Sequence, residues 1–259
     1  MNAVDPPLQM RLARSDRDLR AAQRLRYQVF VQELGATGPM IDHDAQLERD
    51  EFDPYFDHLL LIDPARSADD LADVVGVYRL LPSDRLAQSG RFYSETEYDL
   101  TTLKSSGRKL LELGRSCVHP DYRGGTAMLH LWNGLADYVL DHDIEIMFGA
   151  ASFHGTDLHA LAQPLSYLQR HHLAPPTLRV TARPGANWQP LPEDQQDRKA
   201  AMAGTPALIK AYLRLGGYVG QGIWIDRAFN TTDVCLVMDT HKMSAKHRAF
   251  YIRKQARDA

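Results

Sequence analysis

Residues 111–125 read LELGRSCVHPDYRGG, and this stretch decides the prediction of the fold. Its first half is an apolar run typical of a β-strand, yet it contains Glu112 and Arg115. Its second half turns at a proline and ends in Arg-Gly-Gly, just before a helical pattern over residues 126–141. A nearly continuous apolar run at 144–151 follows, which is typical of a central strand. The order of strand, tight turn, helix and strand predicts one βαβ unit.

The rest of the chain predicts a mixed sheet around this unit. Before it, the spacing of apolar residues predicts a helix over 18–34 and an antiparallel pair of strands over 58–63 and 74–81. After it, we expect a helix over 206–215 and closing strands over 218–225 and 233–238. The fold class is therefore α/β (α+β): a single domain over residues 1–259 with a mostly antiparallel central sheet, flanking helices and a C-terminal extension.

Composition excludes several classes of function. The net charge of −3 gives no nucleic-acid footprint. The N-terminus lacks the apolar core of a signal peptide, and no run is long enough to span a bilayer, so we expect a cytoplasmic protein. The two cysteines, Cys117 and Cys235, lack any metal-binding spacing, which favours buried free thiols and no metal site.

Both ends of the chain are rich in arginine and lysine, including a basic tail over residues 240–259. Such runs are usually solvated helix faces. The alternative is a docking surface for an acidic partner or for the anionic inner membrane, which would make the protein peripheral to that membrane.

The glycine turn indicates an anion site. Glycines between a strand and a helix let the backbone approach a phosphate, and the positive end of the helix favours negative charge. Arg123, Gly124 and Gly125 stand at this position. A purely structural turn is the alternative interpretation.

The longer pattern VHPDYRGG resembles the pyrophosphate loop of the GNAT superfamily of N-acyltransferases. The resemblance implies a GNAT-like domain in which the loop binds the donor through the following residues: Val118, Arg123, Gly124, Gly125 and Thr126. This loop is one residue shorter than the usual form. It is therefore more compatible with the 4'-phosphopantetheine of acyl carrier protein, which has one phosphate and no nucleotide, than with coenzyme A, and the resemblance implies no permanently bound cofactor.

Four further motifs occur in order: RYQVF (26–30), ERDEFD (48–53), GVYRLLP (76–82) and ELGR (112–115). Together they resemble the acyl-homoserine-lactone synthases. The departures, a glycine at position 114 and a longer chain, point to a sister family.

Over residues 10–255 the sequence resembles the L-ornithine Nα-acyltransferases of bacterial ornithine-lipid synthesis, in segments such as MFGAASFHGTD (147–157). This resemblance implies transfer of a 3-hydroxyacyl chain from acyl carrier protein to the α-amine of L-ornithine, giving lyso-ornithine lipid.

The chemistry of this reaction assigns roles to residues of the first motifs. The acceptor amine must lose a proton, and Glu112 is the candidate base, unless it forms a structural ion pair with Arg115. Arg79 or Arg115 could bind the acceptor carboxylate in a bidentate manner. Asp50 and Asp53 could face its side-chain ammonium, or could tie down their loop through Arg26.

The remaining candidates belong to the substrate site or to its entrance. Phe30 ends the first motif, and Phe153, His154 and Asp157 follow the central strand, where they could line the path of the carrier arm. His154 could protonate the leaving thiolate, although a polar loop histidine is the simpler interpretation.

Recognition of the donor has one further candidate. Carrier proteins are acidic, so Arg17, Arg20 and Arg24 of the first helix could steer them by charge.

Two alternatives stay open at this point. The chain could be a signal synthase of the acyl-homoserine-lactone kind, or a non-catalytic module that binds acyl carrier protein or lipid. Within the lead hypothesis, the sequence does not separate ornithine from lysine or glutamine as acceptor, and it does not give the acyl length.

Overall fold

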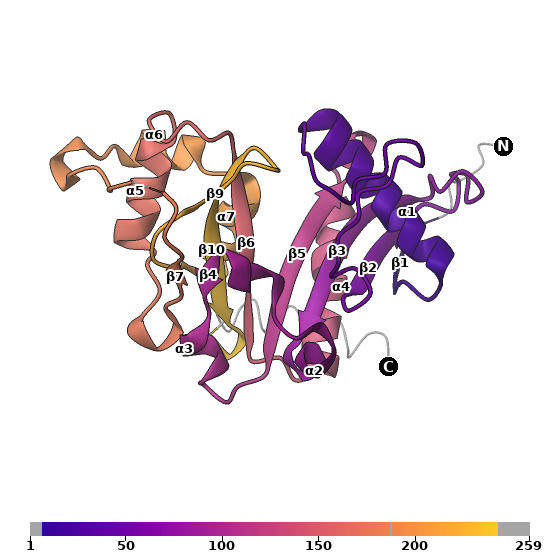
Figure 1. The fold of residues 1–259 in the computed structure, drawn as a ribbon, viewed down its shortest axis with the longest axis horizontal. Helices are drawn as coiled ribbons and strands as arrows, with labels where there is room; N and C mark the ends of the chain where they lie inside the picture. Colours follow the sequence, from indigo (N-terminus) through magenta and orange to yellow (C-terminus); the bar gives the residue numbers. More distant parts are fainter. Residues whose placement is uncertain (1–6, 187, 243–259) are drawn as a thin grey trace. The chain divides into compact units, whose positions relative to one another are not determined.

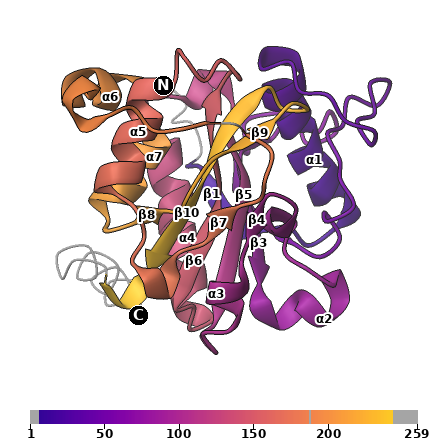
Figure 2. The same ribbon diagram turned by 60° about the vertical axis from the view of Figure 1, so that its left-hand side comes forward.

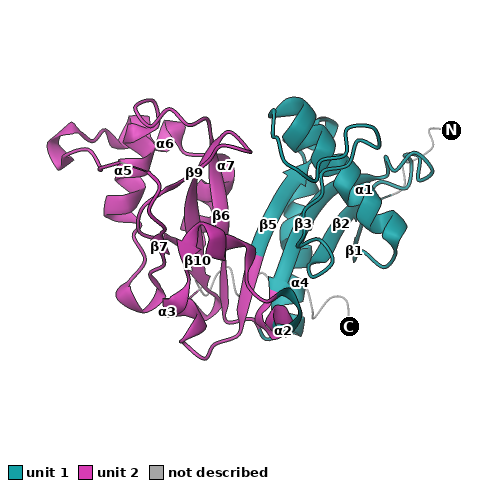
Figure 3. Ribbon diagram, in the orientation of Figure 1, with its two compact units in different colours: residues 1–81, 87–89, 113–143 teal, residues 82–86, 90–112, 144–259 magenta. Residues whose placement is uncertain are grey.

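The computed structural model describes residues 7–186 and 188–242 (Figure 1). These residues form two compact units, each assembled from discontinuous segments (Figure 3). The first unit comprises residues 1–81, 87–89 and 113–143, and the second comprises 82–86, 90–112 and 144–259. Most of the predicted basic tail lies outside the described residues.

The first unit contains the N-terminal part of the sheet. Strands β1 (Gln9–Leu12), β2 (Asp57–Ile62) and β3 (Val74–Pro82) pair in antiparallel fashion. Strand β5 (Leu110–Val118) lies next to β3, and its residues from Leu113 onward belong to this unit. Nearly every residue of β2 and β3 is buried, so these strands are covered on both faces.

Two helices cover opposite faces of this sheet. Alternate strand side chains point to opposite faces. Leu60 and Ile62 pack under α1 (Asp16–Arg26), whereas the neighbouring Leu61 faces α4 (Ala127–Asp141). Helix α1 begins at Ser15, whose hydroxyl accepts a hydrogen bond from Asp18 N, and it continues as a π-helix over Tyr27–Glu33.

The second unit is built on β6 (Ile146–His154) and β10 (Thr231–Asp239), which pair along their full length in antiparallel fashion. Strands β8 (Tyr218–Val219) and β9 (Trp224–Asp226) also pair with β10, and Figure 2 shows β9 and β10 side by side. Leu110–Glu112 of β5 pair in parallel with the start of β6.

Short elements complete the second unit. Helices α5 (Ala162–His171) and α6 (Arg198–Gly204) pack together, and α7 (Ala207–Arg214) contacts β10. A two-stranded ribbon joins β4 (Tyr98–Asp99) to β7 (Thr181–Ala182). The helical turns of the predicted loop region are the 3₁₀ turn η3 (Tyr93–Thr96) and α3 (Thr101–Lys104) in this unit, and α2 (Leu86–Ser89), most of which belongs to the first unit.

The predicted βαβ unit and the antiparallel strand pair are confirmed. The prediction of one strand over 218–225 is wrong: β8 and β9 are separate, because the chain turns at Gly222, where φ is 82°. Helices α5 and α6 were not predicted. Proline at position 164 reads as a helix breaker, yet it lies in the first turn of α5, where proline is tolerated.

Within the described residues, no helix is both long and apolar enough to cross a membrane.

Helix α4 offers a matched test of the core. Leu131 is fully buried, and its side chain fills the place that a side chain at Gly76 of β3 would occupy. Leu129 on the same helix is 51% exposed. We expect Leu131→Ala to lower the free energy of unfolding by about 2–5 kcal/mol, because it leaves a cavity. Leu129→Ala should change it by less than about 0.5 kcal/mol. Urea denaturation of the two variants checks this, and equal losses would contradict the packing described.

Candidate active site

Six charged side chains of the first unit form a closed ring of ion pairs. Each arginine contacts two carboxylates and each carboxylate contacts two arginines. In order around the ring these are Arg26, Glu48, Arg115, Asp50, Arg79 and Asp53.

The ring is tightest at its buried side. Arg26 bonds Glu48 and lies 2.6 Å from Asp53, and Arg79 lies 2.9 Å from Asp53 and 2.7 Å from Asp50. The contacts of Arg115 are longer, at 3.2 Å to Asp50 and 3.4 Å to Glu48. The looser contacts are therefore those of Arg115, whose side chain is the most accessible of the three arginines.

The ring holds its charges in spite of burial. Arg26 is fully buried, and burial alone would lower the pKa of its guanidinium. Glu48 and Asp53 outweigh that effect and raise the pKa. Burial likewise opposes the charge on the carboxylates, but Arg26 and Arg115 lower the pKa of Glu48, and Arg79 and Arg115 lower the pKa of Asp50. The ring contains three arginines and three carboxylates, so its formal charges cancel.

Further groups support the ring. The Gln23 amide donates to Asp53 Oδ2 at 2.9 Å, and the guanidinium of Arg79 lies 4.3 Å from the ring centre of Phe56. His58 lies next to the Asp53 carbonyl at 3.0 Å, and burial followed by Arg26 lowers its pKa to about 4. His58 is therefore neutral at neutral pH and adds no charge to the ring.

Strand β5 is distorted where it joins the ring. Arg115 has φ 49°, in the left-handed region that costs an L-residue about 1–2 kcal/mol. It follows Gly114, whose missing side chain leaves space beside Arg79 Nε. The ion pairs of Arg115 with Glu48 and Asp50 offset this local cost.

Among the predicted roles of these residues, the observed contacts favour loop tying for Asp53. Both its oxygens accept hydrogen bonds, from Gln23 and from the arginines. Arg79 is 1% exposed, so its guanidinium does not present a free face to a substrate carboxylate. Asp50 and Arg115 are the ring members with accessible surface.

The glycine loop follows β5 in the same unit. A 3₁₀ turn over Pro120–Tyr122 leads to Gly124, where φ is 77°, and α4 begins at Ala127. Gly125 and Thr126 are exposed. Arg123 donates to the Val118 carbonyl at 3.1 Å and forms two 2.6 Å bonds with Glu33. A phosphate at this loop would compete with Glu33 for Arg123.

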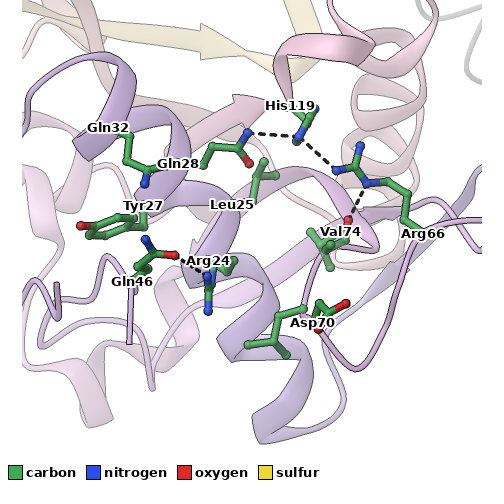
Figure 4. Close-up of a pocket in the computed structure, with 12 residues that line it drawn as sticks. Arg24, Leu25, Tyr27, Gln28, Gln32, Gln46, Arg66, Asp70, Val74 and His119 are labelled. Carbon is green, nitrogen blue, oxygen red and sulfur yellow. Dashed lines mark hydrogen bonds between the residues drawn. The ribbon is translucent and has the colours of Figure 1, made fainter. Parts of the chain in front are cut away.

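A polar hollow of about 210 Å³ lies beside His119, the residue before the 3₁₀ turn of this loop (Figure 4). Gln28 and Arg66 both point toward His119, at 3.1 and 3.3 Å from its Nε2. Burial and the charge of Arg66 lower the pKa of His119. Arg24 borders the same hollow and bonds Gln46 at 2.6 Å, so two of its wall residues are cationic.

Glu112 lies in the second unit and is buried, with 1% exposure. Its carboxylate accepts hydrogen bonds from the backbone of Tyr93 at 2.8 Å and of Ser94 at 2.6 Å, and from the Ser94 hydroxyl. These donors stand at the start of η3, where carboxylates are favoured. Glu112 therefore has a structural contact that the sequence did not predict, in addition to any catalytic role.

The other predicted site residues are dispersed. Phe30 packs against the core under α1, and Phe153 is buried in β6. His154 is exposed at the end of β6, and Asp157 accepts hydrogen bonds from the backbone of the turn that follows it. Burial raises the pKa of the free thiol of Cys117 to about 12, which argues against a covalent nucleophile there.

Sequence reasoning missed several polar groups. Glu48 lies in the motif ERDEFD (48–53), but the sequence indicated no role for it, although it closes the ring. Glu97, Asp226 and Asp233 form an acidic cluster in the second unit, with one oxygen of each within 4.8 Å of the others. No motif signals this cluster, because β9, β10 and η3 bring it together from distant parts of the sequence.

Comparison with known proteins places these features in a family. The acetyltransferase (GNAT) domain family matches residues 25–133. A curated L-ornithine Nα-acyltransferase from Rhodobacter capsulatus is 61% identical over 98% of this chain and 98% of its own length. The chain belongs to the L-ornithine Nα-acyltransferase family. The resemblance seen in the sequence is confirmed, and so is the GNAT-like fold class.

Solved structures agree on the fold. An N-acyl amino acid synthase from uncultured soil microbes, FeeM, matches with a TM-score of 0.50 at 10% identity, covering 92% of this chain and 93% of its own. The acyl-homoserine-lactone synthase LasI matches with a TM-score of 0.50 at 14% identity, covering 90% of each chain. At these identities the likeness concerns the fold alone.

The charged ring yields a stability prediction. Asp53→Asn would leave Arg26 and Arg79 without their shared carboxylate, and loss of one partner of a buried ion pair costs about 3–5 kcal/mol. We expect a loss of that size in the free energy of unfolding, measured by urea denaturation. Asp42→Asn breaks the exposed pair with Arg49 and should cost at most about 1 kcal/mol. Similar losses in both variants would show that the ring does not stabilise the fold.

Proposed function

We propose that this chain transfers a 3-hydroxyacyl group from acyl carrier protein to the α-amine of L-ornithine, forming lyso-ornithine lipid. The full-length identity of 61% to a curated L-ornithine Nα-acyltransferase supports the acceptor and the reaction. The amine nitrogen forms a bond to the thioester carbonyl carbon, the carbon–sulfur bond breaks, and the sulfur leaves as the thiol of the carrier arm.

The acceptor amine must be neutral to attack. An α-amino group has a pKa of about 8, so most of it is protonated near neutral pH and a base must accept a proton. Glu112 is the proposed base. The carboxylate accepts hydrogen bonds from Tyr93 and Ser94, which fix its position. A base of fixed position can be aligned with the bound amine, which supports this role.

The tetrahedral intermediate needs a hydrogen-bond donor for its oxyanion. The backbone N–H near Val118 is the proposed donor, at the end of the same strand that contains Glu112. The amine attacks the thioester directly, so no acyl-enzyme on cysteine is required.

The glycine loop is the proposed phosphate site of the donor. Gly124, Gly125 and Thr126 are exposed at the N-terminus of α4, a 15-residue helix. Arg123 pairs with the exposed carboxylate of Glu33, and exposed pairs are weak, so a phosphate can replace Glu33. The loop is one residue shorter than the usual GNAT form, which supports a donor with a single phosphate.

The two units are proposed to act as one domain. The chain passes between them repeatedly, so neither unit is a continuous stretch of sequence. The GNAT family match over 25–133 also spans residues of both.

A substrate panel tests the function. Purified protein is incubated with 3-hydroxyacyl carrier protein or the matching acyl coenzyme A, and with ornithine, lysine, glutamine or S-adenosylmethionine. Mass spectrometry should find the acyl-ornithine product with the carrier-protein donor. Product with S-adenosylmethionine alone would indicate a signal synthase, and no product with any acceptor would indicate a binding module.

The base assignment predicts a specific defect. Glu112→Gln keeps one oxygen, which can accept from Tyr93 N or from Ser94 but not from both, and its amide cannot take a proton. We expect kcat to fall by about 10²- to 10⁴-fold, together with a loss of stability of about 1–3 kcal/mol, because one buried backbone N–H loses its acceptor. Ser94→Ala is the matched control, since it removes one hydrogen bond to Glu112 and leaves the carboxylate. If the two variants keep similar turnover, Glu112 is a structural residue.

Carrier recognition predicts a salt-dependent effect on the first helix. Arg17 is paired with Asp73 and Arg24 bonds Gln46, whereas Arg20 is exposed. Arg20→Glu should raise KM for the acidic carrier at low salt, and the difference from wild type should shrink as salt rises. Arg198→Glu, on α6 of the second unit, should leave KM unchanged. A salt-independent effect would exclude steering by this helix.

A further inference from the structure

The acidic cluster of the second unit consists of Glu97, Asp226 and Asp233. Glu97 follows η3, Asp226 ends β9, and Asp233 lies in β10. Glu97 and Asp233 are each 3% exposed, and Asp226 is half-buried. One oxygen of each lies within 4.8 Å of the other two. Three carboxylates at such distances repel one another, and a bound cation would relieve that repulsion.

A buried hydroxyl provides an independent sign of a ligand. Thr231 stands directly opposite Asp226 in the register of β9 and β10, and two residues before Asp233, so the three side chains share one face of the sheet. Thr231 is 8% exposed, and within residues 7–186 and 188–242 its hydroxyl has no hydrogen-bond partner. Buried polar groups are nearly always hydrogen-bonded, so an unpartnered one facing an acidic cluster indicates a missing ligand.

The geometry fits an alkylammonium ion. An ammonium group has three N–H donors and no acceptor. At hydrogen-bond distances of about 2.8 Å, three oxygens arranged around one ammonium lie about 4.6 Å apart. The cluster supplies three such oxygens within 4.8 Å, and the Thr231 hydroxyl adds a neutral acceptor on the same face.

The cluster is linked to Glu112 through η3. Glu112 bonds the backbone of Ser94, and the Glu97 N–H donates to the Ser94 carbonyl at 3.0 Å. A 3₁₀ turn rises about 2 Å per residue, so the three residues from Ser94 to Glu97 span about 6 Å. Carboxylates thus stand at both ends of one short turn. This spacing suits an acceptor with two amines joined by a short alkyl chain.

We propose that Glu97, Asp226 and Asp233 bind the side-chain ammonium of the acceptor amino acid while its α-amine lies at Glu112. This inference rests on the proposed function and assigns its selectivity. Asp50 and Asp53, the acids that the sequence suggested for this task, are engaged with arginines in the charged ring.

The test compares ornithine with norvaline, which has the same carbon skeleton but no side-chain amine. Asp226→Asn is the main variant, because an asparagine oxygen can still accept from Ala228 and Phe229, as Asp226 Oδ1 does at 2.8 and 3.0 Å. We expect KM for ornithine to rise about 10- to 100-fold, the range for a lost hydrogen bond to a charged group. KM for norvaline should stay within about twofold of wild type, a change worth well under 1 kcal/mol.

Two further variants strengthen the comparison. Thr231→Val keeps the shape and removes the hydroxyl, so KM for ornithine should rise by a smaller factor, with norvaline unaffected. Asp194→Asn removes an exposed acid of the same unit and should change neither KM. Unfolding temperatures of all variants exclude a general loss of structure.

The outcomes separate the inference from the proposed function. Equal use of ornithine and norvaline by the wild type, or equal rises for both in Asp226→Asn, would overturn the ammonium site while acyl transfer stands. Loss of the preference for ornithine in EDTA, with recovery on adding Mg²⁺ or Ca²⁺, would also overturn the ammonium site, because the cluster would then bind a metal ion. Absence of transfer to any amino acid would overturn the proposed function itself, and the inference with it.

Discussion

The closed ring of ion pairs in the first unit is the interaction on which the position of its functional segments depends. It joins α1, the loop over residues 47–56, β3 and β5 through six side chains, four of them almost fully buried. A buried charge without a partner costs several kcal/mol, so each member of the ring requires its neighbours. The irregular loop is thereby fixed on the sheet by ion pairs in addition to its buried Leu47, Phe52 and Phe56, and the left-handed conformation of Arg115 is retained.

Strand β5 joins this structural device to the proposed chemistry. Glu112 lies at the end of its parallel pairing with β6, Arg115 belongs to the ring, and the glycine loop follows Val118. Alternate residues of a strand face opposite sides, but the positive φ at Arg115 breaks that alternation. The charges that seemed out of place in an apolar run therefore have different partners: Glu112 holds η3, and Arg115 holds the loop with Glu48 and Asp50.

The sequence predicted those parts of the molecule that depend on local patterns. Apolar periodicity located β2, β3, β5, β6 and α4, and the glycine turn located the loop before α4, because each signal lies within a few neighbouring residues. It also placed five of the six ring members, all but Glu48, in motifs with assigned roles, although it could not choose between binding and loop tying. The acidic cluster was not predictable, because Glu97, Asp226 and Asp233 meet only through the register of β9 with β10 and the position of η3. Strand pairing between residues so far apart in the sequence produces no periodic spacing from which it could be predicted.

Charge balance distinguishes the two groups of acids. The ring contains three arginines and three carboxylates, so a substrate ion could enter it only by displacing a charge that is already paired. The cluster around Thr231 gathers three carboxylates and a hydroxyl without a hydrogen-bond partner among the described residues, so a cation entering it gains attraction and satisfies a buried group. A fold that needs acids for structure neutralises them internally. A buried hydroxyl that faces three clustered carboxylates and lacks a hydrogen-bond partner among the described residues is better explained by a cationic ligand at that point.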